Sequence, residues 1–190
     1  MPINLPNLIT VLRILLIPLI VGVFYVPDGW LTYEGKNITA TAIFIFAALT
    51  DWLDGYLARK LDQMSAFGAF LDPVADKLVV IGALIVLLYL NRVDMVVALI
   101  IIGREIAISA LREWMAKMGQ SASVAVAFIG KLKTVAQMVA IPLLLFHERL
   151  FGMLDCQWLG TILINVAAVL TVISMLYYLR KALPYASVRG

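Results

Sequence analysis

The chain has 190 residues, of which 63% are hydrophobic and only 14% are charged. Its mean hydropathy of +0.99 excludes an ordinary water-soluble domain of this length. The formal net charge of +3 suits a chain that lies beside anionic lipid, and we expect no nucleic-acid partner.

Six apolar runs follow one another, each close to the roughly 20 residues that a helix needs to cross a hydrocarbon core. None alternates polar and apolar residues at period two, so membrane β-strands are not expected. We therefore predict an all-α polytopic membrane protein in which residues 1–190 form a single transmembrane catalytic domain. Cys156, the single cysteine, is expected in the loop before the last span. The spans are expected at about 7–26, 38–60, 67–90, 94–115, 126–146 and 158–180.

Basic residues are divided unequally between the two sides of this six-helix bundle. Eight lie on the side that also holds both termini, and three lie on the other side. Because cytoplasmic loops carry the excess of Lys and Arg, we place the first side and both termini in the cytoplasm. The eight are Arg59, Lys60, Lys117, Lys131, Lys133, Arg180, Lys181 and Arg189, and the three are Lys36, Arg92 and Arg149.

Four aspartates interrupt the second and third spans, which are otherwise apolar. Asp51 and Asp54 are three residues apart and Asp72 and Asp76 are four apart, so each pair shares one face of its helix. The polar turn KLDQMS lies midway between the pairs. A helical hairpin therefore brings both pairs to one depth in the cytoplasmic half of the membrane, facing each other. Pro73 is expected to start or bend the third span at this point.

Four carboxylates at such a depth destabilise the fold by several kcal/mol unless positive charge neutralises them. Divalent metal ions supply that charge, and oxygen ligands without nearby His or Cys favour Mg²⁺, Mn²⁺ or Ca²⁺ over zinc. Two carboxylates on each of two helices can hold two ions, an arrangement used for phosphoryl displacement. Gly55, Ala58 and Gly68 lie beside the acids and either leave room for a ligand or pack the helices closely.

The acids and their neighbours resemble the complete signature of the CDP-alcohol phosphotransferase family. Eight positions match, in Asp51-x-x-Asp54-Gly55-x-x-Ala58-Arg59 and, after eight residues, Gly68-x-x-x-Asp72-x-x-x-Asp76. The resemblance implies six membrane helices, a homodimer, and transfer of a phosphatidyl group from a CDP-linked lipid to an alcohol with release of CMP. It also implies two Mg²⁺ or Mn²⁺ ions held by the four aspartates, with Asp76 as the general base.

The resemblance also indicates where the nucleotide binds. The segment PNLITVLR resembles the family's N-terminal segment beside the nucleotide, and Asn7, Thr10 and Arg13 share one helix face there at spacing three. A capping Asn and an anchoring Arg are the alternative interpretation. The residues assigned to CDP binding are Asn7, Thr10, Gly55, Ala58, Arg59 and Gly68.

Spans four and five carry more cations than acids, in GREIAISALREWMAK and GKLKTVAQM. Arg104 and Arg112 are eight residues apart and share roughly one face. Some charges must pair, either Arg112 with Glu105 or Glu113 with Lys117. The remaining positive charge indicates an acceptor alcohol that already carries phosphate, which Arg binds through two hydrogen bonds and Lys as a point charge. Its expected ligands are Arg104, Arg112, Lys131 and Lys133.

These segments, together with DWLDGYLAR and FGAFLDPVADK, are closely similar to bacterial family members that join CDP-diacylglycerol to sn-glycerol 3-phosphate. We therefore expect a phospholipid-synthesis enzyme of a bacterial inner membrane, with its active site facing the cytoplasm. The alternatives are a family member that uses inositol 1-phosphate or phosphatidylglycerol as acceptor, and a divalent-metal transporter. Lys77 is expected to pair with Asp72, and His147 to be a solvated loop residue.

Overall fold

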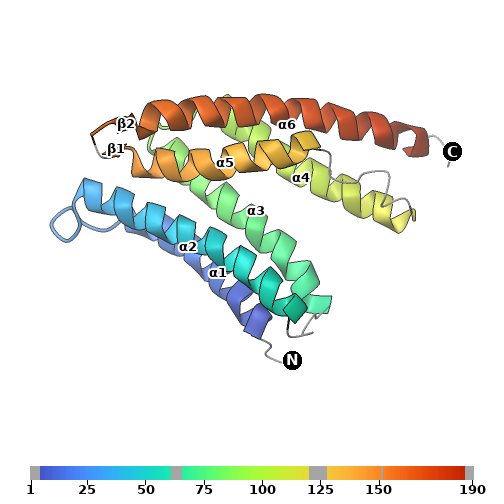
Figure 1. Ribbon diagram of the computed structural model, residues 1–190, viewed down its shortest axis with the longest axis horizontal. Coiled ribbons are helices and arrows are strands. Elements are labelled where there is room, and N and C mark those ends of the chain that lie inside the picture. The colour runs from blue at the N-terminus through green and yellow to red at the C-terminus, as the bar shows by residue number, and fades with distance from the viewer. Residues whose placement is uncertain (1–4, 61–65, 120–127, 151, 187–190) are drawn as a thin grey trace.

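The computed structural model describes residues 5–60, 66–119, 128–150 and 152–186, and over these residues it consists of six helices and a short β-hairpin (Figure 1). The hairpin joins the last two helices, and its antiparallel strands pair Arg149 with Asp155 and Leu150 with Leu154. In chain order the elements are α1 (Leu5–Val23), α2 (Tyr33–Lys60), α3 (Ala66–Tyr89), α4 (Met95–Lys117), α5 (Phe128–Phe146), β1 (Arg149–Leu150), β2 (Leu154–Asp155) and α6 (Cys156–Ala186).

Each of the six expected spans corresponds to one observed helix, which confirms the prediction of a helical fold. By length and composition, α5 and α6 are the two described helices that could cross a membrane, and a shorter apolar stretch covers Asn7–Val23. The start of α4 has a local cause, because the Asp94 carboxylate accepts hydrogen bonds from the backbone N–H groups of Val96 (2.8 Å) and Val97 (3.4 Å). Pro73 lies inside α3 and does not start it.

The helices form two groups. α1 packs on α2 and α3, whereas α6 packs on α4 and α5. Contacts of α2 with α5 and of α3 with α4 join the groups, which diverge toward the end of the molecule that holds both termini (Figure 1). The divergence matters for function because the signature aspartates lie in the last part of α2 and the first half of α3. These parts of the two helices lie near that end (Figure 1).

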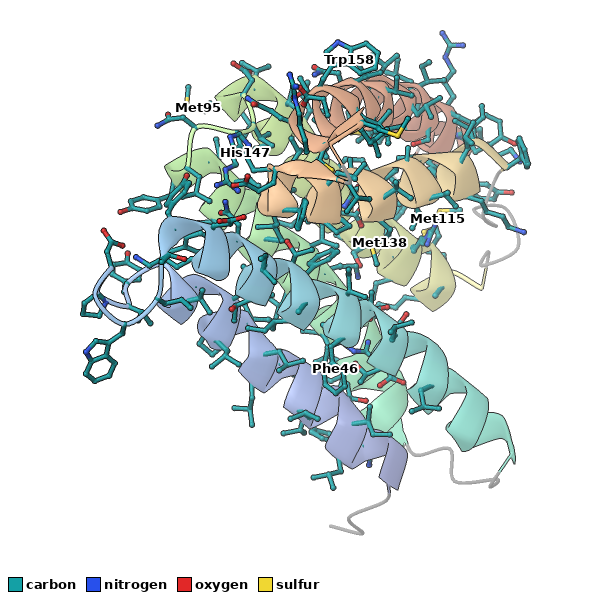
Figure 2. All side chains as sticks on the ribbon, turned by 60° about the vertical axis from the view of Figure 1, so that its left-hand side comes forward. Phe46, Met95, Met115, Met138, His147 and Trp158 are labelled. Atoms are coloured by element: carbon teal, nitrogen blue, oxygen red, sulfur yellow. The ribbon has the colours of Figure 1, made fainter. Side chains whose placement is uncertain are left out.

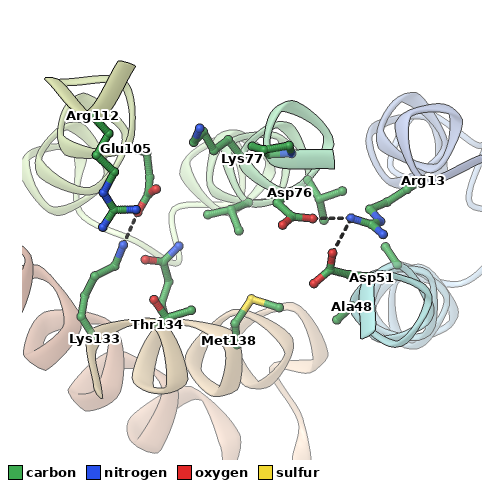
Figure 3. Close-up of a pocket in the computed structure, with 15 residues that line it drawn as sticks. Arg13, Ala48, Asp51, Asp76, Lys77, Glu105, Arg112, Lys133, Thr134 and Met138 are labelled. Carbon is green, nitrogen blue, oxygen red and sulfur yellow. Dashed lines mark hydrogen bonds and ion pairs between the residues drawn. The ribbon is translucent and has the colours of Figure 1, made fainter. Parts of the chain in front are cut away.

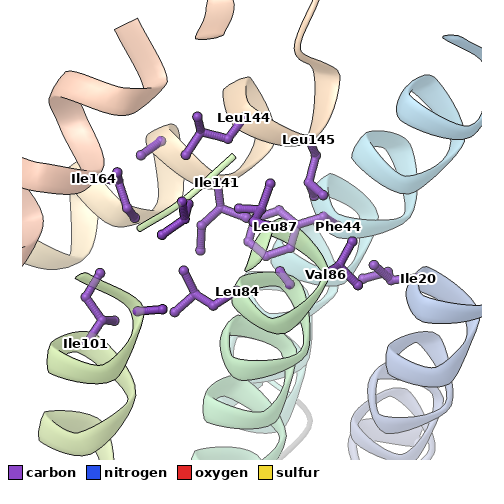
Figure 4. Packing of buried hydrophobic residues seen from close by; sticks show 14 of the residues in the cluster. Ile20, Phe44, Leu84, Val86, Leu87, Ile101, Ile141, Leu144, Leu145 and Ile164 are labelled. Atoms are coloured by element: carbon purple, nitrogen blue, oxygen red, sulfur yellow. The ribbon is translucent and has the colours of Figure 1, made fainter. Parts of the chain in front are cut away.

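All six helices contribute to one hydrophobic core, which lies where the two groups meet (Figure 4). Gly160 on α6 allows close approach to α5, since a Cβ atom there would lie 2.8 Å from Leu144 Cγ. Gly82 on α3 does the same toward α1, where a Cβ atom would lie 2.7 Å from Ile17 Cγ2. Small residues at such crossings are typical of helices packed within a membrane. Core side chains include Ile20, Phe44, Leu84, Leu87, Ile101, Ile141, Leu144 and Ile164.

Large apolar side chains also cover the outside of the helices, as Figure 2 shows for Phe46, Met95 and Trp158. Leu15 on α1 and Val135 on α5 are each about 60% exposed. Outward apolar surface on this scale is unfavourable in water and favourable in lipid. The surface therefore agrees with the composition in indicating a membrane-associated protein.

The end of α5 near the hairpin is held by Arg92, which is buried. Its Nη1 donates to the carbonyl oxygens of Leu144 (2.9 Å) and Leu145 (2.7 Å), and its Nη2 donates to Asn37 Oδ1 (2.7 Å). A guanidinium group thus satisfies backbone carbonyls that the helix end leaves without partners. Arg92 therefore links α2, α5 and the turn after α3.

One expectation about this end of the molecule was wrong, and another holds in part. Cys156 is not a loop residue but the buried first residue of α6. His147 is the expected loop residue, directly after α5 in a left-handed conformation (φ 62°), but its side chain is only partly exposed and lies near Arg92. Burial and the Arg92 charge both lower the pKa of His147, so its imidazole stays neutral to lower pH than usual.

Candidate active site

A cavity of about 310 Å³ opens between the two helix groups and is lined by residues of α1, α2, α3, α4 and α5 (Figure 3). Its two ends differ in chemistry. Asp51 and Asp76 lie at the end toward α1, while Lys133 and Arg112 lie at the opposite end with Glu105 (Figure 3). Apolar and small side chains such as Ala48, Val80 and Met138 line the space between these ends.

At the acidic end, Arg13 brings together two carboxylates from different helices. Arg13 Nη1 lies 2.7 Å from Asp51 Oδ1 on α2, and the same nitrogen contacts Asp76 Oδ1 on α3. The Arg13 side chain is 1% exposed, whereas each aspartate side chain is 46% exposed. The convergence of acids from the second and third spans, expected from the hairpin, is therefore observed for this pair.

The third described acid, Asp72, faces the first helix. Thr10 Oγ1 donates a hydrogen bond of 2.6 Å to Asp72 Oδ1, and Thr10 is fully buried. Thr10 and Arg13 thus lie on one face of α1 and contact Asp72, Asp51 and Asp76, as their spacing of three residues allows. Asn7 is half-buried one turn earlier. The face of α1 predicted to border the nucleotide therefore contacts the acids directly.

Part of the signature falls outside what the structure describes. The side chains of Asp54, Gly55, Ala58 and Arg59 belong to the end of α2, where only the helical backbone is described. Gly68 lies on α3 and is buried. Among the side chains that are described, no group of three His, Cys, Asp or Glu residues is close enough to hold a metal ion.

The carboxylate oxygens at this end are nevertheless suitable ligands for a divalent ion. Asp51 and Asp76 converge at one end of a cavity, and both are partly exposed to it. Paired carboxylate oxygens, with no Cys or His among the described residues that line the cavity, match the preference of Mg²⁺ and Mn²⁺. Asp54 follows Asp51 by three residues in the sequence, the spacing that predicts a shared helix face.

The basic end of the cavity is organised around Glu105 of α4. Lys133 Nζ on α5 contacts Glu105 Oε1, and Arg104 Nη1 lies 3.5 Å from the same oxygen. The Lys133 side chain is 3% exposed and the Glu105 side chain is 16% exposed. Two cations therefore share one carboxylate, which leaves net positive charge beside the cavity.

Tyr178 of α6 contacts both Arg104 and Arg112. Its ring centroid lies 5.4 Å from Arg112 Cζ and 5.9 Å from Arg104 Cζ, and its hydroxyl accepts a hydrogen bond of 3.5 Å from Arg112 Nη2. Arg104 Nη2 also donates to Ser174 Oγ at 3.3 Å. Arg112 lines the cavity, whereas Arg104 lies behind Glu105 and does not. Stacking on an aromatic ring holds a guanidinium group in one orientation.

The four cations expected to bind acceptor phosphate are therefore placed differently. Arg112 and Lys133 line the cavity, Arg104 supports it through Glu105, and Lys131 is exposed on α5 away from the lining. Of the two expected ion pairs, Glu113 with Lys117 is confirmed at 2.9 Å. Glu105, the expected partner of Arg112, is instead in contact with Lys133 and Arg104.

Sequence reasoning missed three contacts at this cavity. Lys77 was expected to pair with Asp72, but its Nζ donates to Ser109 Oγ on α4. Arg13 was expected on the face of the first span beside the nucleotide or as an anchoring residue, but its contacts with two acids of the signature were not predicted. Glu105 was expected only as a possible partner of Arg112, but it contacts Lys133 and Arg104 and is the centre of the basic end. All three depend on which helices become neighbours, which helical periodicity alone does not determine.

Apolar helices around a cavity with carboxylates at one end and cations at the other are typical of a membrane enzyme that handles phosphorylated substrates. The sequence model of the CDP-alcohol phosphatidyltransferase family matches residues 3–173. The chain belongs to this family, which confirms the resemblance inferred from the acidic signature.

Curated relatives are similar over nearly the whole chain. The identity is 47% to a protein of Salmonella choleraesuis (strain SC-B67), and 48% to proteins of Shigella flexneri serotype 5b (strain 8401) and Escherichia coli (strain K12). Each alignment spans 184 residues, 96% of this chain and 96% of the relative. Each of these relatives is named CDP-diacylglycerol–glycerol-3-phosphate 3-phosphatidyltransferase.

Proposed function

We propose that this protein transfers the phosphatidyl group of CDP-diacylglycerol to sn-glycerol 3-phosphate, giving phosphatidylglycerophosphate and CMP. The observation that carries the proposal is the 47–48% identity, over 96% of the chain, to relatives named for this reaction. The cavity agrees with it, because its acidic end suits a metal-bound diphosphate and its basic end suits an acceptor that carries phosphate.

The proposed metal ligands are Asp51, Asp54, Asp72 and Asp76, with two Mg²⁺ or Mn²⁺ ions as cofactors. Such ions, when bound, neutralise the diphosphate of the donor and the charge that develops on departing CMP. Hard carboxylate oxygens and the location of the acids on two facing helices support this assignment. Arg13 orients Asp51 and Asp76, and Thr10 orients Asp72.

On the donor side, we assign CDP binding to the face of α1 and the ends of α2 and α3 beside the acids. A hydroxyl oxygen of the acceptor attacks the phosphorus of the phosphatidyl group, and the bond from that phosphorus to the CMP oxygen breaks. CMP leaves with the electron pair of that bond. Asp76, which lines the cavity, takes the hydroxyl proton. The residues assigned to CDP are Asn7, Thr10, Gly55, Ala58, Arg59 and Gly68.

On the acceptor side, Lys133 and Arg112 are the proposed phosphate ligands, because both line the cavity at the end opposite the acids. The phosphate then lies at the basic end while the hydroxyl end of the same molecule points toward Asp76. Arg104 contributes charge from behind Glu105. Lys131, although proposed from the sequence, has the weakest geometric support because it is exposed outside the lining.

We further propose that all six helices cross the membrane and that both termini and the acidic end of the cavity face the cytoplasm. The alternation of helix direction in Figure 1 and the clustering of basic residues near the termini support this orientation. The compartment is then the bacterial inner membrane, residues 1–190 form one catalytic domain, and the family resemblance suggests a homodimer.

A CMP-release assay with purified protein tests the reaction. We expect CMP release from CDP-diacylglycerol to require glycerol 3-phosphate and either Mg²⁺ or Mn²⁺. Release with inositol 1-phosphate or phosphatidylglycerol in place of glycerol 3-phosphate would contradict the proposed acceptor. Metal flux into liposomes without any nucleotide would instead favour the transporter.

A further inference from the structure

Arg13 is the largest of the fully buried side chains that the structure describes, and it is charged. It reaches from α1 between α2 and α3 and contacts Asp51 and Asp76 through one nitrogen (Figure 3). Arg13 lines the same end of the cavity as the two acids, which lie between it and the basic end (Figure 3). Arg13 therefore lies behind the acids, while the acids face the space where substrates would bind.

A permanent charge in this position has electrostatic consequences. Arginine keeps its proton under all ordinary conditions, so Arg13 is always positive. Without it, two carboxylates from different helices would repel each other and destabilise the contact between α2 and α3. With it, however, any further cation that binds these carboxylates also approaches the Arg13 charge.

We propose that Arg13 is a resident counter-charge that holds Asp51 and Asp76 together in the metal-free protein and competes electrostatically with the divalent ions for them. The proposal rests on the metal site of the proposed function. In it, Arg13 and the ions are negatively coupled, since each lowers the affinity of the acids for the other. Arg13 is a positioning residue, because it acts through the aspartates.

The charge balance suggests why such competition is useful. Four ligand aspartates carry −4 and two divalent ions carry +4, so the loaded site without Arg13 would be neutral. Arg13 adds +1, which leaves the loaded site attractive to the diphosphate of the donor lipid. Some metal affinity is then exchanged for affinity toward the anionic substrate.

Two substitutions separate this role from simple packing. Arg13→Gln removes the charge and keeps hydrogen-bonding ability, whereas Arg13→Lys keeps the charge with fewer donors. Arg92→Gln is the matched control, because Arg92 is also a buried arginine but lies at the other end of α3, far from the acids. Each protein is purified in detergent with chelator and titrated with Mn²⁺ alone.

Electron paramagnetic resonance of free Mn²⁺ gives the binding midpoint, and the thermal midpoint is followed in parallel. We expect Arg13→Gln to bind Mn²⁺ on the order of tenfold more tightly than the unmodified protein, a coupling of ordinary size. Arg13→Lys should bind Mn²⁺ like the unmodified protein. Without metal, Arg13→Gln should have a lowered thermal midpoint, and saturating Mn²⁺ should restore most of the loss. Arg92→Gln should be destabilised equally with and without Mn²⁺.

Unchanged or weaker Mn²⁺ binding by Arg13→Gln would overturn the proposal and leave Arg13 as a packing residue. Failure of Arg13→Gln to fold even when purified in Mn²⁺ would also count against it, because the ions must be able to replace the lost charge. If the unmodified protein bound no Mn²⁺, the metal site of the proposed function would itself be wrong. The two failures are therefore distinguishable.

Discussion

Replacing Lys133 by methionine tests whether the basic end of the cavity binds the acceptor. The Lys133 ammonium group lines the cavity, contacts Glu105, and belongs to a side chain that is 3% exposed. Methionine is unbranched and of similar length, so the variant loses the charge with little change in packing. If Lys133 binds the acceptor phosphate, the loss must appear in the kinetics of glycerol 3-phosphate.

The expected size follows from the strength of one charged hydrogen bond. Hydrogen bonds to charged groups contribute about 1.5–3 kcal/mol. Because each 1.4 kcal/mol corresponds to a factor of ten, kcat/KM for glycerol 3-phosphate should fall roughly 10- to 150-fold. The KM for CDP-diacylglycerol should change little, since the donor is expected at the opposite, acidic end.

The assay measures CMP release in detergent micelles, with one substrate varied while the other is saturating. Lys131→Met is the matched control, because Lys131 lies two residues earlier on the same helix but is exposed outside the lining. Among the described residues, removing Lys133 leaves Glu105 with only the Arg104 ion pair at 3.5 Å, so stability must be checked by the thermal midpoint. The double variant Lys133→Met/Glu105→Gln should recover stability without recovering acceptor affinity.

Equal rises in KM for both substrates would refute the reasoning, because they would show that Lys133 supports the whole cavity. An effect of Lys131→Met as large as that of Lys133→Met would refute it in another way. The exposed lysine would then contact the acceptor, and the observed arrangement of α5 would not describe the working enzyme.

Three further outcomes are expected. Asp76→Asn should lower turnover about 10²- to 10⁴-fold while CDP-diacylglycerol still binds, and normal turnover in the CMP assay would remove Asp76 as the base. Chelation by EDTA should abolish CMP release and lower the thermal midpoint, and added Mg²⁺ or Mn²⁺ should restore both; activity that survives chelation would contradict the metal requirement. Arg92→Met should destabilise the protein by about 2–4 kcal/mol, because it removes the donors to the Leu144 and Leu145 carbonyls, whereas exposed Arg149→Met should not. Equal thermal midpoints for these last two variants would show that the hydrogen bonds from Arg92 to the Leu144 and Leu145 carbonyls contribute no stability.

The helices and the acidic pair were predictable because their causes are local or nearly so. Apolar runs of membrane length form helices, and a short polar turn between two of them makes a hairpin. Asp51 and Asp76 are at similar distances from that turn, so a hairpin brings them together with no further information. The contact that both make with Arg13 is the observed result.

The sequence predicted that cations of the fourth and fifth spans would lie at the site, but not which of them would line the cavity. Residues two apart on a helix point about 200° away from each other, so Lys131 and Lys133 were never both able to line one cavity. Helical periodicity alone does not say which of them faces inward. That depends on how α5 rotates against α2 and α6, which is decided by side-chain packing among residues far apart in the chain.

The sequence alone predicted a helical membrane enzyme with an acidic hairpin suited to divalent ions, because hydrophobic length, residue spacing and the eight-position signature are properties of the chain itself. Only the tertiary structure decided that Arg13 neutralises two of the acids and that Glu105 holds Lys133. Each of these contacts joins helices that are separated in the sequence. The charge on a side chain is known from its identity, but its partner is determined by the packing of the whole bundle.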